Sequence, residues 1–389
     1  MLHLLLSVLS CVAVPDPDAA RLGIESQLRV MEQAMLKGDA AAYLSAVSEA
    51  DSEFLHEQRY FANDFAKKPP AEVTVSLGEL KESDGAATSK LTWTWSMPGA
   101  KAREVAFEAR FIEVDGKWLY AGEVWERHEA PGVMVLFDPG LEEVARNTVE
   151  AFTAVRAKVE ESFGLEKSAL PGRTQKIKLY GSMKHLQHSI CLSYTDGLGG
   201  WNEPKESVKI LAGRSSRVNQ LKGLLSHEYG HVATFELGPK SNVMPWWVLE
   251  GVAELSSEVA VHGRRPRATV ERWARAGRIA PWDSLADFER CEDRWKGHVY
   301  TQGHHMIGYI ADTFGRPRLN AWMTEMSQGA TIDGASEKVL ERPFARLAAE
   351  WRAALPEEGA EEPAPEEGPK KEEPSKDGTA KQEPAAAPK

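Results

Sequence analysis

The sequence predicts an α+β protein with two folded parts, a short apolar N-terminal segment and a polar C-terminal tail. Apolar and polar residues alternate with period two between residues 72 and 128, the pattern of strands with one buried face. Between residues 140 and 355 the apolar residues recur mostly with the period of helices. The last stretch, 356–389, is Pro, Glu, Lys and Ala without apolar periodicity, which predicts a disordered tail.

Length and charge limit the class of protein. The 389 residues suffice for two domains or one large one. A composition of 42% hydrophobic and 27% charged residues is ordinary for a soluble protein. The net charge is -11, and the tail supplies -5 of it through ten acids and five lysines. No basic field indicates binding to DNA or RNA, so we expect no nucleic-acid partner.

The first twenty residues, MLHLLLSVLSCVAVPDPDAA, place a short apolar run before a proline-bearing stretch. The run is too short to cross a bilayer and resembles a secretory signal, so we expect an exported protein, periplasmic, cell-envelope or extracellular. The residues VLSC are similar to a bacterial lipobox, which leaves membrane attachment through a lipid on Cys11 as a second interpretation. An apolar first helix of a cytosolic protein is a third, which the two following prolines disfavour.

Cys191 and Cys291 are the other two cysteines. In an exported protein they form a disulfide if the fold brings them together, and otherwise they are two free thiols. Neither has the spacing of a metal ligand. The sequence does not indicate the oligomeric state.

Residues 21–130 are predicted to form the first folded domain. Two amphipathic helices lie within 21–48 and are separated at Gly38-Asp39. Four alternating runs follow, and Asp115-Gly116 turns the third into the fourth. They are VTVSLGEL, TSKLTWTWSM, REVAFEARFIEV and KWLYAGEVWERH. This order, including the hairpin DGKWLYAGE, resembles the cone-shaped domains similar to nuclear transport factor 2 (NTF2). The resemblance implies a ligand site or an inert spacer, and because no catalytic set is present we expect a binding or positioning role.

Residues 131–355 are predicted to form a second, mainly helical domain with a small sheet. Three short strands are expected, at 132–136, 175–180 and 206–211. Helices are expected at 140–163, 183–189, 246–259, 299–314, 319–326 and 344–354. One further helix, which carries the motif HEYGH, is expected to begin at a cap on Ser215 or Ser216 and to stop at Gly238-Pro239.

The motif His227-Glu228-Tyr229-Gly230-His231 carries the chemistry. Residues four apart on a helix stand about one turn apart, so both imidazoles reach one ion while Glu228 lies beside it. This is the geometry that a zinc-activated water requires. The motif predicts His227 and His231 as zinc ligands and Glu228 as a general base.

A catalytic zinc ion needs a third protein ligand and one open position. Glu250 follows His231 by nineteen residues, in the predicted helix PWWVLEGVAEL, and a loop between the two helices lets it face the histidines. His227, His231 and Glu250 form a nitrogen and oxygen set that suits one zinc ion per chain. Glu254, one turn further on, is placed to accept a hydrogen bond from the outer nitrogen of a ligand histidine.

The spacing of HEYGH, eighteen intervening residues and EGVAE resembles the gluzincin metallopeptidases, in particular the peptidase MA-like families. In the related M1 aminopeptidases a tyrosine some fifty residues after the glutamate ligand stabilises the oxyanion. This chain has Tyr300-Thr301-Gln302-Gly303 fifty residues after Glu250, with glutamine where that family has lysine. The resemblance covers about residues 132–355 and implies that Tyr300 is catalytic.

The same resemblance indicates peptide-bond hydrolysis with a peptide or protein as substrate. Glu228 is expected to take a proton from the zinc-activated water and pass it to the leaving amine. No Gly-x-Met-x-Asn segment precedes the metal helix, so the amine recognition of aminopeptidases is not implied and an endopeptidase is favoured. Residues 207–212 are expected to be the edge strand that binds the peptide.

Other interpretations stay open. A catalytically silent protein that keeps the metallopeptidase fold, as a binding or scaffold protein of the bacterial envelope, is the main alternative, and the intact Glu228 argues against it. Tyr300 is otherwise a core tyrosine of its helix. Nearby histidines at 298, 304 and 305 either line the cleft or pack in the core. Trp246 and Trp247 are expected in the core.

Overall fold

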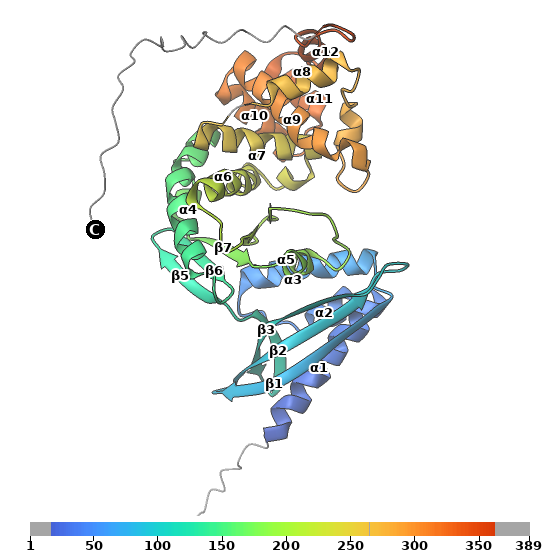
Figure 1. Ribbon diagram of the computed structural model, residues 1–389, viewed down its shortest axis with the longest axis vertical. Helices are drawn as coiled ribbons and strands as arrows, with labels where there is room; N and C mark the ends of the chain where they lie inside the picture. The colour runs from blue at the N-terminus through green and yellow to red at the C-terminus, as the bar shows by residue number, and fades with distance from the viewer. Residues whose placement is uncertain (1–16, 264, 362–389) are drawn as a thin grey trace, which may run out of the picture.

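Two hydrophobic cores organise the chain in the computed structural model, which describes residues 17–263 and 265–361 (Figure 1). The first core is built from the helices and strands that precede residue 124 together with Leu192, and the second from those that follow residue 132. The mixture of helices and sheets fits the α+β class that the sequence predicts. The predicted signal and lipobox, with Cys11, lie outside the described residues, as does the tail from residue 362 onward.

Three helices begin the first unit: α1 (Pro17–Lys37), α2 (Ala40–Leu44) and α3 (Ser52–Lys67). The break between α1 and α2 lies at Gly38, as predicted, and a left-handed φ of 67° favours glycine there. Helix α3 was not predicted. Asp51 caps its first turn by accepting from the amides of residues 53 and 54, and its buried face includes the charged Glu57, which interrupts the apolar periodicity.

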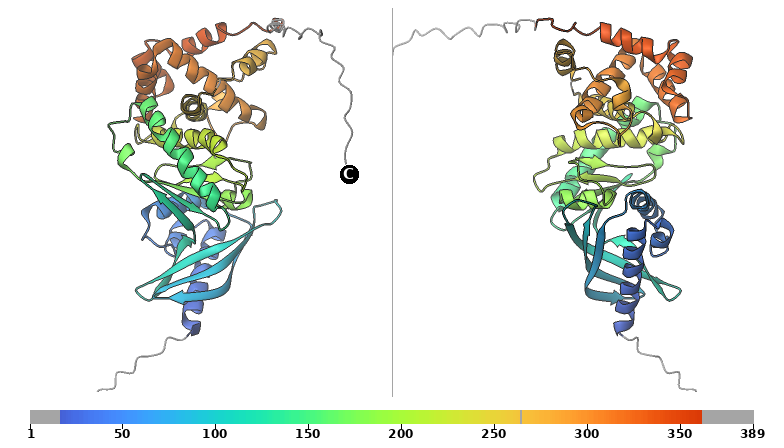
Figure 2. Two further views of the ribbon diagram at one scale, coloured as in Figure 1. Left: turned by 60° about the vertical axis from the view of Figure 1, so that its left-hand side comes forward. Right: turned by 90° about the vertical axis from the view of Figure 1, so that its right-hand side faces the viewer.

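The first sheet is an antiparallel meander in the order β1 (Glu72–Ser83), β2 (Ala86–Ser96), β3 (Arg103–Val114) and β4 (Lys117–Glu123). Positive φ values of 52° at Asp115 and 75° at Gly116 make the predicted tight turn between β3 and β4. Helices α1 to α3 and, from the second unit, α5 (Met183–Ile190) cover one face of this sheet (Figure 2).

The run predicted as one strand, KWLYAGEVWERH, is two strands in two different sheets. Its first half is β4, and its second half begins β5 (Glu126–Ala130). Strand β5 pairs with β6 (Val133–Phe137), so the second sheet begins before the boundary predicted at residue 131. The run alternates on both sides of the crossing, and for that reason period alone does not reveal it.

The second sheet has the order β5-β6-β7-β9-β8. Strands β6, β7 (Gln175–Tyr180) and β9 (Val208–Leu211) are parallel, and the two outer strands run antiparallel to their neighbours. The predicted edge strand at 207–212 is wrong in its placement: β9 lies inside the sheet, and β8 (Gly200–Trp201) forms the edge. Two residues, one of them glycine, are too few to show a strand period.

Helices cover the second sheet and extend beyond it. The four that matter most here are α4 (Glu142–Phe163), α6 (Val218–Phe235), α7 (Trp246–Val261) and α9 (Asp293–Phe314). The others are α8 (Arg267–Arg275), α10 (Arg316–Ser327), α11 (Ile332–Ala335) and α12 (Phe344–Ala353). Helix α6 does not begin at Ser215 or Ser216. Arg217 is its cap residue, its amide donating to the Gln220 side chain at 3.1 Å, because Ser216 Oγ accepts instead from the amide of Gly213.

Cys191 and Cys291 are free thiols, so no disulfide joins them. None of the helices in the described ranges is long and apolar enough to cross a membrane.

Candidate metal site

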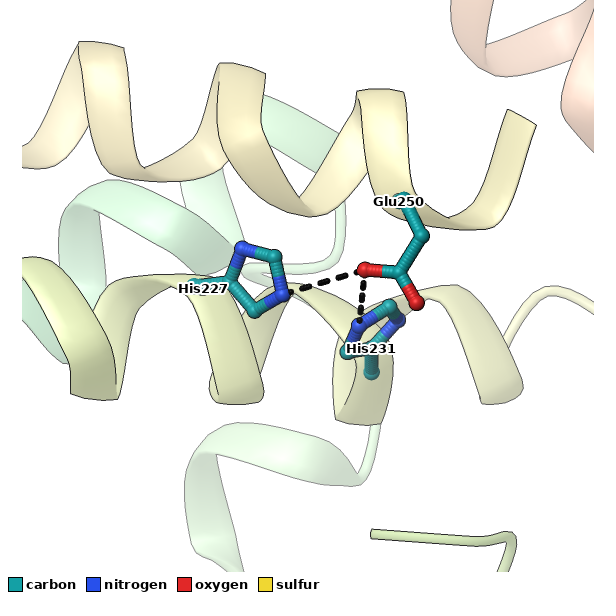
Figure 3. Close-up of side chains that lie close together, drawn as sticks. All are labelled: His227, His231 and Glu250. Carbon is teal, nitrogen blue, oxygen red and sulfur yellow. Dashed lines mark ion pairs between the residues drawn. The ribbon is translucent and has the colours of Figure 1, made fainter. Parts of the chain in front are cut away.

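The nitrogens of His227 and His231 converge on one carboxylate oxygen of Glu250 (Figure 3). His227 Nε2 lies 3.2 Å and His231 Nε2 lies 3.4 Å from Glu250 Oε2. Both histidines project from α6 and Glu250 projects from α7, as the sequence spacing predicts. The three predicted metal ligands are therefore together, and within the described residues they are the one such group of His, Cys, Asp and Glu.

These residues fit a zinc ion. Ligand atoms at about 2.0–2.2 Å from zinc in a tetrahedron lie roughly 3.3–3.6 Å from one another, close to the two distances observed. Glu250 Oε2 is buried without a hydrogen-bond donor among the described residues, an arrangement that a cation relieves. Burial opposes the charge of Glu250, but the two histidines outweigh it and hold the pKa of Glu250 below its ordinary value.

Two further side chains orient the ligands. Glu254 Oε1 lies 3.3 Å from His227 Nδ1, on the side away from Glu250, which agrees with the role predicted for it. Trp246 Nε1 donates to Glu250 Oε1 at 2.9 Å, so the second carboxylate oxygen is fixed by an indole. This role of Trp246 was missed, although its position one turn before Glu250 on the same helix was a usable signal. Trp247 is a core residue, as expected.

Close helix crossings bring the motifs together. A Cβ atom on Gly230 would lie 2.8 Å from Ser256 Oγ of α7. One on Gly251 would lie 2.6 Å from the carbonyl carbon of Gly303 of α9, and one on Gly303 would lie 2.6 Å from the carbonyl oxygen of Trp247. A larger residue at Gly230 would push α6 and α7 apart and separate the ligands, whereas one at Gly251 or Gly303 would push α7 and α9 apart and move Tyr300 away from them.

Glu228 points toward the sheet side of α6 and is buried. Gly200 of β8 approaches it so closely that a Cβ atom there would lie 2.5 Å from Glu228 Oε1. Burial raises the pKa of Glu228 above its ordinary value, although the nearby histidines act in the opposite direction. The edge strand therefore covers the predicted general base with backbone alone.

Tyr300 of α9 stands beside the ligands. Its ring centroid is 6.3 Å from that of His227 and 6.0 Å from that of Trp246, and the residue is 38% exposed. Burial of the hydroxyl and the surrounding carboxylates raise the pKa of Tyr300, so the hydroxyl keeps its proton at neutral pH. Tyr300 is thus a partly open hydrogen-bond donor rather than a core tyrosine.

A cleft of about 1070 Å³ contains these groups. Its walls are the segment 197–203, the exposed faces of α6 and α7, the loop 286–289 and Tyr300. Lys67, at the end of α3, contributes from the first unit. Aromatic rings of Tyr194, Trp201 and Phe288 pack against one another along one side.

The three histidines near Tyr300 each form a polar contact with a residue that is not a predicted metal ligand. His298 contacts the carbonyl oxygen of Arg278 at 2.9 Å and stacks on Trp273. His304 pairs with Glu258 at 2.6 Å, and His305 accepts a hydrogen bond from Trp351. None of the three lines the cleft that contains the ligands, and the packing interpretation holds for His298 and His305. His304 lines a smaller adjoining hollow of about 240 Å³ together with Glu254 and Tyr300.

The sequence matches no family model and no curated protein. Several solved structures are similar to part of it, and two of them serve as examples. An NTF-2-like protein of unknown function from Shewanella oneidensis MR-1 is 16% identical, with 26% of this chain and 94% of that chain covered and a TM-score of 0.24. A protein of unknown function from Mycobacterium tuberculosis is 18% identical, with 26% and 68% covered and a TM-score of 0.22.

Proposed function

We propose that the chain is a zinc-dependent metallopeptidase of gluzincin type. The observation that supports this proposal is the convergence of His227, His231 and Glu250 in a cleft that also contains Glu228. Three protein ligands with a fourth position left over are the set of a catalytic zinc, whereas structural zinc sites use four. A purely structural metal has no use for Glu228, a buried acid that is not among the ligands.

The residues have separable roles in this proposal. A bound zinc ion supplies an acidified water and polarises the peptide carbonyl. Glu228 takes the proton of that water and delivers it to the leaving amine. The protonated hydroxyl of Tyr300 donates a hydrogen bond to the carbonyl oxygen as negative charge develops on it. Glu254 and Trp246 hold His227 and Glu250 in their orientations.

The cleft favours a peptide chain as substrate. Its volume of about 1070 Å³ is at the upper limit of the roughly 300–1,000 Å³ of small-molecule pockets. We propose an endopeptidase because no Gly-x-Met-x-Asn segment precedes the metal helix, so the sequence does not imply recognition of a substrate's terminal amine. Export of the protein, with or without a lipid on Cys11, is a further part of the proposal that rests on residues 1–20 alone.

A binding or scaffold protein without turnover is the second candidate. One contact favours it: Lys68, next to the cleft residue Lys67, pairs with Glu289 of the loop 286–289 at 3.7 Å, so the first unit reaches the rim of the cleft. Both side chains of this pair are more than half exposed, and ion pairs as exposed as this one contribute little to stability. The contact therefore narrows the cleft without sealing it.

Metal analysis joined to a cleavage assay tests the proposal. We expect about one zinc per chain in the purified wild type, its loss in His231→Ala, and cleavage of a peptide library by the wild type. Glu228→Gln should keep the zinc and lose roughly 10²–10⁴-fold in rate. A Glu228→Gln protein as active as the wild type would contradict the mechanism. Zinc binding without any cleavage would favour the scaffold, and no zinc after reloading would contradict both the metal and the peptidase.

A further inference from the structure

The hollow of the first unit is filled by the chain itself. The ring of His188, on α5, lies among four aromatic rings of the first unit, which we call the aromatic box. Centroid distances from His188 are 5.0 Å to Trp93, 5.3 Å to Trp95, 5.6 Å to Phe107 and 5.8 Å to Phe61. Both ring nitrogens of His188 are buried without a hydrogen-bond partner among the described residues, so the box holds this ring by packing.

Polar side chains of the first unit form hydrogen bonds to residues 187–194, which include the end of α5 and the loop after it. Arg103 of β3 donates to the carbonyl oxygen of Tyr194 and to Gln187 Oε1, both at 2.5 Å. Trp95 Nε1 donates to the carbonyl oxygen of Leu192 at 3.0 Å. Asp64 of α3 accepts a hydrogen bond of 2.7 Å from Ser193 Oγ. The Leu192 side chain is fully buried in the first hydrophobic core. Residues 187–194 are thus bound as a ligand would be, by apolar burial and by directed donors.

The segment 187–194 continues directly into the wall of the cleft. Tyr194 is already a wall residue, and residues 197–203 form the wall that contains β8. On its far side Asp196 pairs with Lys296 of α9 at 2.6 Å. Gly200, in this wall, is the residue that approaches Glu228. A shift of residues 194–200 would therefore move the backbone that lies over Glu228.

We propose that the first unit is a positioning domain: it binds residues 187–194 of its own chain in its hollow and thereby fixes the wall of the cleft. Arg103, Asp64 and Trp95 are its positioning residues. The hollow is not a site for a diffusible ligand, because His188 occupies it. The effect on catalysis rests on the proposed peptidase function, whereas the fixing of the wall does not.

Hydrogen exchange of the full-length protein, followed by mass spectrometry, tests the proposal without any substrate. In Arg103→Ala we expect exchange of residues 194–203 to rise at least about tenfold, the size of effect expected when a hydrogen bond from a charged group is lost. Arg103→Lys, which keeps a donor, should restore part of the protection. Arg110→Ala, at an exposed arginine of the same strand, is the matched control and should exchange like the wild type. Asp64→Asn offers a second, milder test if Arg103→Ala folds poorly.

Three readouts separate the outcomes. Zinc content should be unchanged in all these variants, because the ligands lie on α6 and α7. If the peptidase proposal holds, Arg103→Ala should raise KM more than it lowers kcat, whereas a general loss of folded protein lowers the apparent kcat alone. Unchanged exchange at 194–203 in both Arg103→Ala and Asp64→Asn would overturn the positioning role. If the wild type cleaves no peptide, the peptidase proposal fails, but the hydrogen-exchange result still decides whether the first unit fixes residues 194–203.

Indole serves as a probe of the aromatic box. We expect no saturable binding to the wild type and binding to His188→Ala, whose box has lost its occupant. Saturable binding to the wild type that also raises exchange at 194–203 would show that the hollow opens to external ligands, and would overturn the proposal.

Discussion

Two glutamates, the partly buried Glu250 in the cleft and the buried Glu57 between the two units, face basic side chains in different ways. Glu57 Oε2 accepts from Lys178 Nζ at 2.5 Å, and Glu57 Oε1 accepts from the hydroxyl of Ser207. Glu250 Oε2 has two imidazole nitrogens at 3.2 and 3.4 Å and no hydrogen-bond donor among the described residues. Glu57 is thus paired with a lysine, which is a permanent cation at neutral pH, whereas Glu250 is paired with two imidazoles, which can also bind a metal ion together with the carboxylate.

The difference lies in which basic residue the chain supplies. A buried lysine carries its own proton, and although burial opposes its charge, Glu57 keeps the pKa of Lys178 above its ordinary value. An imidazole can instead give up its proton and bind a metal ion through the lone pair of the ring nitrogen. Glu57 belongs to α3 and Lys178 to β7, so this pair joins the two units. The histidine cluster lies within the second unit and does not join the two.

Lys178→Met should have the largest effect on stability. It leaves Glu57 buried without its cation, and we expect the free energy of unfolding to fall by about 3–5 kcal/mol, measured by urea denaturation. Lys176→Met is the control: Lys176 lies on the same strand, but its partners Asp51 and Glu53 are 54% and 28% exposed and so keep contact with water, and a loss of about 0–1 kcal/mol is expected. Equal losses of unfolding free energy in the two variants would show that the buried pair of Lys178 and Glu57 is no more important than the more exposed pairs of Lys176. Zinc content should not change in either.

Glu250→Ala should instead affect metal binding more than stability. We expect zinc affinity to fall by at least the roughly 100-fold that outer-shell partners can be worth, because a direct ligand is lost. With a chelator present, the melting temperature should fall less than in Lys178→Met, because the two histidines can lose their protons and no buried charge is then left without a partner. Glu258→Gln, two turns further along α7 and paired with His304, is the control for metal affinity. Unchanged zinc affinity in Glu250→Ala would place the third ligand elsewhere.

His185 extends the comparison to a group that titrates. Burial lowers its pKa, but Glu123 at 3.4 Å and Asp138 at 3.8 Å outweigh this and raise the pKa of His185 to about 9. A folded-state pKa above the unfolded value of about 6.5 stabilises the protein fully below pH 6.5, and this contribution is lost as the pH rises through 9. His185→Gln should be less stable than the wild type at about pH 6 and close to it at about pH 9.5. A difference independent of pH would show that packing against Phe107 and Tyr180 dominates.

Trp246→Phe should have the smallest effect. It removes the donor to Glu250 Oε1 while keeping an aromatic ring, and we expect a loss of about tenfold in zinc affinity, measured by competition with a chelator. Trp247→Phe, in the core of the same helix, should leave the affinity unchanged while lowering stability. If the two variants bind zinc equally well, the indole does not orient Glu250.

The candidate site was predictable because its spacing is local. His227 and His231 share one helix, Glu250 and Glu254 share the next, and the period of a helix fixes which residues face the same way. Tyr300 was placed only through a family resemblance, and the structure puts its ring beside His227. Most strands and long helices were predictable for the same local reason. Helices α3, α8 and α11 and strand β8 were not predicted. The buried charge of Glu57 interrupts the apolar period of α3, α8 buries only two residues, and α11 and β8 are too short to show a period.

The sequence by itself determined the helices, the alternating strands and the histidine pair with its following glutamates, since each depends on residues a few positions apart. Only the tertiary structure decided which buried charges meet. Lys178 finds Glu57 across 121 positions of the chain, and Arg103 finds Gln187 across 84. No periodicity encodes such contacts, because they arise when two separately patterned units pack together and every buried donor must find an acceptor.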